Sequence, residues 1–240
     1  MNLLSMNNSK KKRGKKMAYD YKKAFSVEGK KCIVTGGAQG LSKGMAEALL
    51  ENGAAVVLMD VQKEKLEMVT NEYKAMGYEA YCVSGDLSKK EEIDRMFEEA
   101  MKLLGGRLDV LIPAAGIQRR YEPWEFPKEM WDLVINVNLN HVWFMCQKAI
   151  QVMKDQDTVG KIINIGSMSS FFGGTTVPAY TAAKGAVTQL SKSIASDCAD
   201  HNICCNVIAP GYMDTEMCAN MTQERNCLLY TSPSPRDPKT

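Results

Sequence analysis

Histidine is scarce in this 240-residue chain, which holds only His141 and His201. None of its eight cysteines belongs to a C-x-x-C pair, although protein zinc sites are built from closely spaced cysteines and histidines. We therefore expect no metal site. Several cysteines lie within short apolar runs, where a free thiol behaves as a small hydrophobe, and this usage indicates a reducing compartment.

Long hydrophobic runs are also missing. No apolar stretch approaches the ~20 residues of a membrane-spanning helix, and the N-terminus lacks the apolar core of a secretory signal. The formal net charge is only +2, and much of the basic excess lies in one run at residues 10–16. A basic face for nucleic acid is therefore not expected. Together these absences favour a cytoplasmic protein that binds neither a membrane nor nucleic acid.

The two ends differ in composition from the rest of the chain. Residues 1–25 are polar, basic and without periodicity, which predicts a disordered tail. The alternatives are a later true start at Met6 or Met17, or a nuclear or membrane-surface signal. From Cys227 the sequence becomes rich in serine and proline, resembles a translated sequencing adapter, and predicts a non-native or disordered tail over 227–240. A genuine Ser/Pro tail is the alternative.

Between these ends, residues 26–226 read as one α/β domain. Short apolar segments predict strands at 31–35, 55–60, 79–84, 109–113, 161–165 and 204–208. Amphipathic segments between them predict helices at 41–52, 62–76, 89–104, 128–154 and 180–201. This alternation predicts a doubly wound parallel sheet in three layers. Ligands of such sheets bind at the carboxyl ends of the strands, so functional residues are sought there.

A glycine-rich segment follows the first predicted strand and opens a helix. Glycines let the backbone approach a pyrophosphate closely, and the helix N-terminus directs its amides and dipole at the anion. We predict dinucleotide contacts at Gly36, Gln39, Gly40, Leu41 and Ser42. Gly44, one turn further on, is interpreted as a packing residue between helix and strand.

Asp60 closes the second predicted strand, where a dinucleotide-binding fold needs an acid. Its carboxylate can accept hydrogen bonds from the ribose hydroxyls and would repel a 2′-phosphate. The residue after it is Val61 rather than an arginine. The cofactor is therefore predicted to be NAD rather than NADP. The alternative is that Asp60 serves only as a helix N-cap.

Tyr180 and Lys184 lie four residues apart in a predicted helix and so share one face. A free phenol has a pKa of about 10, and a nearby ammonium favours its ionised form. Tyr180 can then take a proton from an alcohol or give one to a ketone. Ser167, after the fifth predicted strand, can hydrogen-bond the substrate oxygen. Asn138 lies inside a predicted helix, an unfavourable place for asparagine that calls for a functional reason.

Taken in order, these segments resemble the short-chain dehydrogenase/reductase family, from about Phe25 to Met221. The family patterns are T-G-x-x-x-G-x-G, N-N-A-G and Y-x-x-x-K. Three positions depart from them: Ser42 replaces the last glycine of the first pattern, and Pro113 and Ala114 replace both asparagines of the second.

The resemblance implies roles for further residues. Asp86 would hydrogen-bond the adenine amino group and Leu87 would contact the ring, although Asp86 as a helix N-cap is a competing interpretation. Asn138 would hold a water that relays protons from Lys184, and Lys184 would also hold the nicotinamide ribose. The remaining cofactor contacts implied by the family are Ala115, Gly116, Pro210, Gly211, Met213 and Thr215.

The family also continues with a seventh strand and forms tetramers. We therefore expect this chain to lack its last strand, and the full-length protein to be a homo-oligomer.

Within the family, the segments 115–120 and 173–180 resemble gluconate and deoxygluconate dehydrogenases. Gln118, Arg119 and Arg120 follow the fourth predicted strand, and a guanidinium there could clamp a sugar-acid carboxylate. A solvated pair or a subunit interface is the alternative. The expected function is NAD-dependent interconversion of a secondary alcohol and a ketone on a small sugar acid. Ser167, Tyr180 and the 118–120 segment would bind the substrate.

Two other functions stay open at this point. A 3-oxoacyl-type ketone reductase would use NADPH and give Arg119 no role. An inactive, truncated nucleotide-binding or scaffold protein would need no intact Asn138, Ser167, Tyr180 and Lys184.

Overall fold

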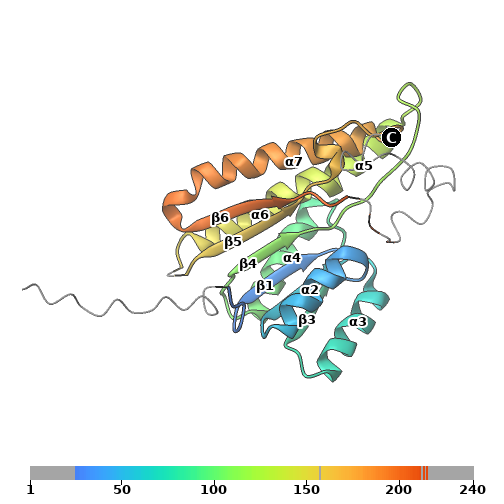
Figure 1. The fold of residues 1–240 in the computed structure, drawn as a ribbon. Helices are drawn as coiled ribbons and strands as arrows, with labels where there is room; N and C mark the ends of the chain where they lie inside the picture. The colour runs from blue at the N-terminus through green and yellow to red at the C-terminus, as the bar shows by residue number, and fades with distance from the viewer. Residues whose placement is uncertain (1–24, 157, 212, 214, 216–240) are drawn as a thin grey trace, which may run out of the picture.

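A computed structural model gives the fold (Figure 1) and describes residues 25–156, 158–211, 213 and 215. The predictions for residues 1–24 and for the tail from Cys227 fall outside these described residues. No helix in the described part of the chain is both long and apolar enough to span a membrane.

Six strands pair side by side in a parallel sheet with the order β3-β2-β1-β4-β5-β6. Each strand lies within one residue of its predicted ends: β1 Lys31–Thr35, β2 Ala55–Asp60, β3 Ala80–Ser84, β4 Val110–Pro113, β5 Gly160–Ile165 and β6 Ile203–Ile208. The predicted doubly wound sheet is confirmed. In the described part of the chain, β6 forms an edge of the sheet, and its Cys204 and Asn206 are exposed.

The helices also follow the predicted pattern, with two corrections. Their bounds are α2 Gly40–Glu51, α3 Lys63–Ala75, α4 Lys90–Leu103, α5 Lys128–Ile135, α6 His141–Met153 and α7 Pro178–Asp197. The single helix predicted over 128–154 is interrupted by a π-helical turn, η1, at Asn136–Asn140. The helix predicted to reach residue 201 ends at Asp197, and a short 3₁₀ turn, η3 (Ala199–His201), follows it.

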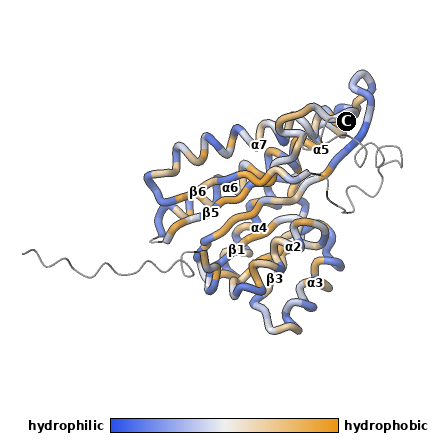
Figure 2. Tube along the Cα trace, in the orientation of Figure 1, coloured by the Kyte–Doolittle hydropathy of each residue, from blue (hydrophilic) through white to orange (hydrophobic). Residues whose placement is uncertain are grey.

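Two apolar cores lie on the two faces of the sheet because both faces are covered by helices. Figure 2 shows the strands as a mostly hydrophobic layer between helices of mixed character. On one face, α2 and α3 pack Leu50 and Leu66 against Val34 and Leu58. On the other face, α4, α6 and α7 supply a larger set: Ile93, Met96, Phe97, Met145, Ala149, Met153, Val187 and Ile194.

The strand order reverses between β1 and β4, which pair with each other although β2 and β3 separate them in the chain. Connections leave β1 and β4 toward opposite faces of the sheet at such a point, so a crevice opens at their carboxyl ends. The topology therefore positions the site before any functional side chain is considered.

Candidate active site

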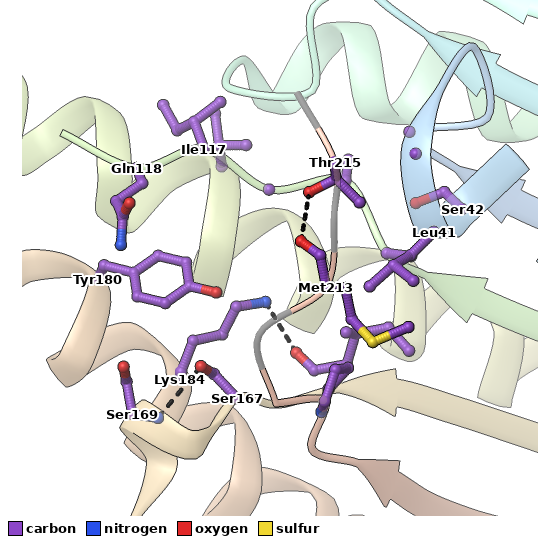
Figure 3. Close-up of a pocket in the computed structure, with 18 of the residues that line it drawn as sticks. Leu41, Ser42, Ile117, Gln118, Ser167, Ser169, Tyr180, Lys184, Met213 and Thr215 are labelled. Atoms are coloured by element: carbon purple, nitrogen blue, oxygen red, sulfur yellow. Dashed lines mark hydrogen bonds between the residues drawn. The ribbon is translucent and has the colours of Figure 1, made fainter. Parts of the chain in front are cut away.

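A cavity of about 620 Å³ opens at the carboxyl ends of the strands and collects nearly all the predicted site residues. Those with predicted cofactor roles are Gly36, Gln39, Gly40, Leu41, Ser42, Asp60, Asp86, Leu87, Ala115, Gly116, Tyr180, Lys184, Pro210, Gly211, Met213 and Thr215. Ser167, Gln118 and Arg120 line it as well. Figure 3 shows Leu41 and Ser42 across the cavity from Tyr180 and Ser167.

Two predicted residues do not line the cavity. The guanidinium of Arg119 is exposed and donates to the carbonyl oxygen of Gln118 at 2.9 Å, so of the two arginines only Arg120 faces the site. Asn138 is fully buried and lies behind the cavity wall.

The glycine-rich loop brings the backbone close to the cavity at specific positions. Gly36 has a φ of +75°, and a Cβ on it would lie 2.9 Å from Ala115 Cα, so a side chain is excluded there. A Cβ on Gly37 would lie 2.9 Å from Leu58 Cβ, which identifies Gly37 as the packing glycine. The packing role expected of Gly44 is wrong, because a Cβ on it would meet nothing within 4 Å.

Asp60 is buried and braces the loops at the end of the cavity that the sequence assigns to the adenosine. Its Oδ2 accepts a hydrogen bond from Ala38 N at 3.1 Å, and its Oδ1 accepts one from Gln62 N at 3.0 Å. The N-cap residue of α3 is Gln62 rather than Asp60. Each carboxylate oxygen can accept a second hydrogen bond, so the carboxylate can still bind hydroxyls from the cavity.

Asp86 is held by the turn that follows β3. Its Oδ1 accepts from Ser88 N at 3.0 Å and from Ser88 Oγ at 2.7 Å, and Lys89 Nζ lies 3.4 Å from Oδ2. Desolvation raises the pKa of Asp86, but the hydrogen bonds from Ser88 and Lys89 outweigh it and hold the pKa below its usual value. The N-cap residue of α4 is Lys89, so Asp86 stabilises a turn and does not cap the helix.

Lys184 and Tyr180 project from the first turns of α7 toward the same part of the cavity. Lys184 Nζ donates to the carbonyl oxygen of Ile165 at 2.7 Å and lies 5.7 Å from the centre of the Tyr180 ring. Figure 3 shows the Tyr180 hydroxyl directed toward this amine. Burial lowers the pKa of Lys184 to about 8. A lysine that stays charged near neutrality is therefore placed beside the phenol.

Ser167 is fixed by a short 3₁₀ turn, η2 (Met168–Ser170). Its Oγ accepts a hydrogen bond from Ser169 N at 3.1 Å, a contact drawn in Figure 3. Ser170 Oγ accepts from Ser167 N at 3.1 Å and donates to Lys184 O at 2.8 Å. Ser167 and Ser170 form a capping box in the structure. Sequence reasoning missed Ser170 because the sequence signal for this motif has glutamate or glutamine at the second position.

Asn138 holds the segment that follows β4. Its Nδ2 donates to the carbonyls of Ile117 and Val134, both at 2.9 Å, and its Oδ1 accepts from Ile117 N at 3.2 Å. A Cβ on Gly116 would lie 2.8 Å from the same Oδ1, so a side chain at position 116 would force Asn138 to move. Asparagine is unfavourable inside a helix, and one reason for its presence at position 138 is that it fixes this wall of the cavity.

The side of the cavity predicted to bind the substrate is formed by two loops that contact each other. Arg120 Nη2 donates to Gln118 Oε1 at 3.1 Å, and Arg120 Nη1 lies 3.4 Å from Thr175 O. Tyr121 N donates to Thr176 O at 3.0 Å. Figure 3 places Gln118 beside the Tyr180 ring, on the side away from Ser42.

The chain has relatives among known proteins that match this geometry. The sequence profile described as short chain dehydrogenase matches residues 30–226. The chain is 41% identical over 203 residues to 2-dehydro-3-deoxy-D-gluconate 5-dehydrogenase of Escherichia coli (strain K12), covering 84% of this chain and 77% of the relative. It is 36% identical over 194 residues to gluconate 5-dehydrogenase of Gluconobacter oxydans (strain 621H), covering 80% and 75%.

A similar solved structure is a gluconate 5-dehydrogenase from Burkholderia cenocepacia J2315 in complex with NADP and tartrate. It shares 32% identity, with a TM-score of 0.76 over 81% of this chain and 76% of that one. The fold, the order of the motifs and these matches lead to one conclusion: the chain belongs to the short-chain dehydrogenase family.

Proposed function

We propose that this oxidoreductase interconverts a secondary alcohol and a ketone on a small sugar acid of the gluconate or deoxygluconate type, with NAD(H) as cofactor. The observation that carries the proposal is the buried Lys184 beside the Tyr180 hydroxyl, at the edge of a cavity that Ser167 also lines. Family membership makes the chain an oxidoreductase, whereas the substrate and the choice of cofactor are our inference.

The residues fit a dinucleotide in shape and in charge. The close approach of Gly36 to Ala115 leaves no room for a side chain, and the N-terminus of α2 opens onto the cavity at Gly40, Leu41 and Ser42, where its dipole favours an anion. When bound, a nicotinamide dinucleotide would supply the hydride acceptor or donor.

The proton chemistry belongs to the chain's own side chains. Tyr180 Oη would take the proton of the substrate alcohol, or return one to the ketone oxygen. The ammonium of Lys184 favours the phenolate form of Tyr180 because opposite charges attract strongly in a dry site. Ser167 Oγ, oriented by the amide of Ser169, can donate to the substrate oxygen while its charge changes.

Arg120 supports a carboxylate-bearing substrate. It is the cavity-lining arginine of the 118–120 segment, and Gln118 Oε1 and Thr175 O orient its guanidinium. A guanidinium matches the two oxygens of a carboxylate. The Burkholderia cenocepacia relative was solved with tartrate, a hydroxy acid, which supports the same substrate chemistry here.

The proposed preference for NAD rests on the buried carboxylate of Asp60, which would repel a 2′-phosphate. Lys65 Nζ donates to Gln39 Oε1 close to this end of the cavity, and a cation there weakens the repulsion. We therefore expect NADH to be preferred and NADPH to be accepted less well. This fits with NADP in the Burkholderia cenocepacia relative.

The test is a substrate panel assayed in both directions, with NAD(H) and with NADP(H). We expect reduction of 5-keto-gluconate by NADH or oxidation of 2-dehydro-3-deoxy-gluconate by NAD⁺, with a higher kcat/KM for NAD(H) than for NADP(H). Arg120→Met should raise KM for the sugar acid about tenfold or more and leave KM for NADH unchanged. Arg119→Met is the matched control and should change neither value. Turnover of a 3-oxoacyl ester with NADPH, unaffected by Arg120→Met, would contradict the proposal.

A further inference from the structure

His141 is a fully buried histidine at the start of α6 that the reaction described above does not use. Its ring contacts two elements that are far apart in the chain. Nδ1 lies 2.9 Å from the carbonyl oxygen of Val137 in η1, and Nε2 lies 3.0 Å from Thr35 Oγ1 at the end of β1. The imidazole therefore bridges the π-helical turn that carries Asn138 and the strand that leads into the glycine-rich loop.

The partners of the ring fix its tautomer. A carbonyl oxygen only accepts hydrogen bonds, so Nδ1 must carry a proton to pair with Val137. Desolvation by burial lowers the pKa of His141 to about 4, so the ring is neutral near pH 7. Nε2 is then unprotonated and accepts a hydrogen bond from the Thr35 hydroxyl.

The hydrogen bonds continue from His141 through Thr35 to the cavity wall. Thr35 Oγ1 donates its proton to His141 and accepts a hydrogen bond from Ala115 N at 2.9 Å. Each polar group from Val137 O through His141 and Thr35 to Ala115 N thus has a partner. Ala115 lines the cavity. The end of β4 has no polar side chain of its own here, because residues 113 and 114 are proline and alanine.

The π-helical turn explains why a side chain is needed at this point. The backbone N–H of His141 donates to Asn136 O, five residues back. In an α-helix that N–H would pair with Val137 O instead. The His141 ring supplies a donor to that carbonyl. His141 therefore stabilises the turn from which Asn138 contacts Ile117, and it also contacts Thr35.

We propose that His141 is a positioning residue of the active site, which as the neutral Nδ1–H imidazole ties the Asn138 turn to the ends of β1 and β4. By doing so it sets the cavity wall at Ala115 and Gly116, where the cofactor is proposed to bind. The tautomer and the contacts stand independently of the proposed function. Only the expected effects on cofactor binding and turnover rest on it.

The first test is ¹⁵N NMR of the 240-residue protein labelled in its two histidines, with His201→Gln to assign the signals. We expect His141 to show a protonated Nδ1 and an unprotonated Nε2 from pH 6 to pH 8. An Nε2–H tautomer, or a ring that becomes charged in this range, would overturn the proposal.

The second test measures NADH affinity by fluorescence for Thr35→Val, His141→Phe and the double variant. Each single variant should weaken binding about tenfold, because each breaks the chain of bonds that holds Ala115 N. The double variant should be no weaker than the worse single variant, because both changes break one chain. Thr35→Ser should restore binding to within about twofold of wild type.

Thr70→Val is the matched control, because Thr70 is also buried and donates to Leu66 O at 2.8 Å in α3, away from the cavity. It should lower the melting temperature without changing NADH affinity. Should His141→Phe fail to fold, His141→Asn replaces it, since asparagine can donate to the carbonyl four residues back, as Asn52 does to Ala48 at 2.8 Å. It should keep the Val137 contact and still weaken NADH binding.

Additive effects in the double variant, or unchanged NADH affinity in variants that fold, would contradict the positioning role. A wild-type protein with the expected tautomer that binds no nicotinamide dinucleotide would instead contradict the proposed function. The two failures are therefore distinguishable.

Discussion

The charge of Lys184 supports the proposed reaction, but burying that charge lowers the stability of the folded protein at neutral pH. Its ammonium is buried, and desolvation lowers its pKa to about 8. An unfolded lysine has a pKa of about 10.4, so the unfolded state binds more protons between pH 8 and pH 10. Stability from this residue therefore rises with pH through that window and is lowest below pH 8.

Lys184→Met should reduce kcat about 10²-fold or more, because the Tyr180 phenolate loses its neighbouring charge. It should also raise the melting temperature at pH 7, because a buried charge is removed. The rise should shrink as the pH approaches 10. Calorimetry at pH 7 and pH 10 together with steady-state kinetics checks both parts. A variant that loses activity and melts lower at pH 7 would contradict this account.

Ser170 acts through its neighbours, since its hydroxyl joins Ser167 N to Lys184 O. Ser170→Ala should lower kcat about tenfold with little change in KM, because Ser167 and Lys184 lose their shared support. Ser191→Ala is the control, because Ser191 is buried in α7, the helix that carries Lys184, and donates to Val187 O at 2.7 Å. Equal loss of kcat in both variants would show that Ser170 has only a structural role.

At the scale of elements, the alternation of strands and helices was predictable because each buried segment repeats its apolar residues at the period of its structure. The π-helical turn at Asn136–Asn140 could not be predicted in this way. One extra residue in a helical turn barely changes an apolar pattern over 128–154, so periodicity reads α5, η1 and α6 as one helix. The local signal was the set of three asparagines at 136, 138 and 140, since asparagine is unfavourable inside a helix.

The loop after η2 holds a strained residue next to Thr175, which lines the cavity and contacts Arg120. Thr176 has a φ of +61°, a conformation that is costly for a β-branched side chain and that asparagine tolerates better. Thr176→Asn should stabilise the protein by about 0.5–1 kcal/mol, which is a rise of about 1–4 °C in melting temperature for a chain of this size.

Thr175→Asn is the matched control, because Thr175 is not among the described non-glycine residues with positive φ. It should give no such rise. An equal rise in both variants would mean that asparagine stabilises the loop for another reason than relief of strain at Thr176.

At the scale of the whole molecule, the topology brings together residues that are scattered along the chain. Asp60 ends β2, Ser167 comes shortly after β5, and Tyr180 lies at the start of α7. They line one cavity because the carboxyl ends of parallel strands share one edge of the sheet. That these three residues share one cavity could be predicted from the sequence. The difference between Arg119 and Arg120 could not, because neighbouring loop residues differ only in direction, and direction depends on contacts with the distant Thr175.

The polar contacts behind the cavity wall could not be predicted from the sequence either. His141 and Thr35 lie far apart in the chain, and only the packing of α6 beneath the end of β1 brings them together. A lone histidine in an apolar helix carries no sign of its partner. The sequence motifs therefore predicted the groups that face the cavity better than the groups that hold the cavity in shape.

Tyr180 is proposed to transfer the proton in a nicotinamide-dependent reaction on a sugar acid. The most direct measurement compares wild type with Tyr180→Phe, both for NADH affinity and for single-turnover oxidation of NADH by a keto-gluconate. For Tyr180→Phe we expect an NADH affinity within about twofold of wild type and a rate at least about 10²-fold lower. A Tyr180→Phe variant that binds NADH normally and turns over at the wild-type rate would contradict this proposal.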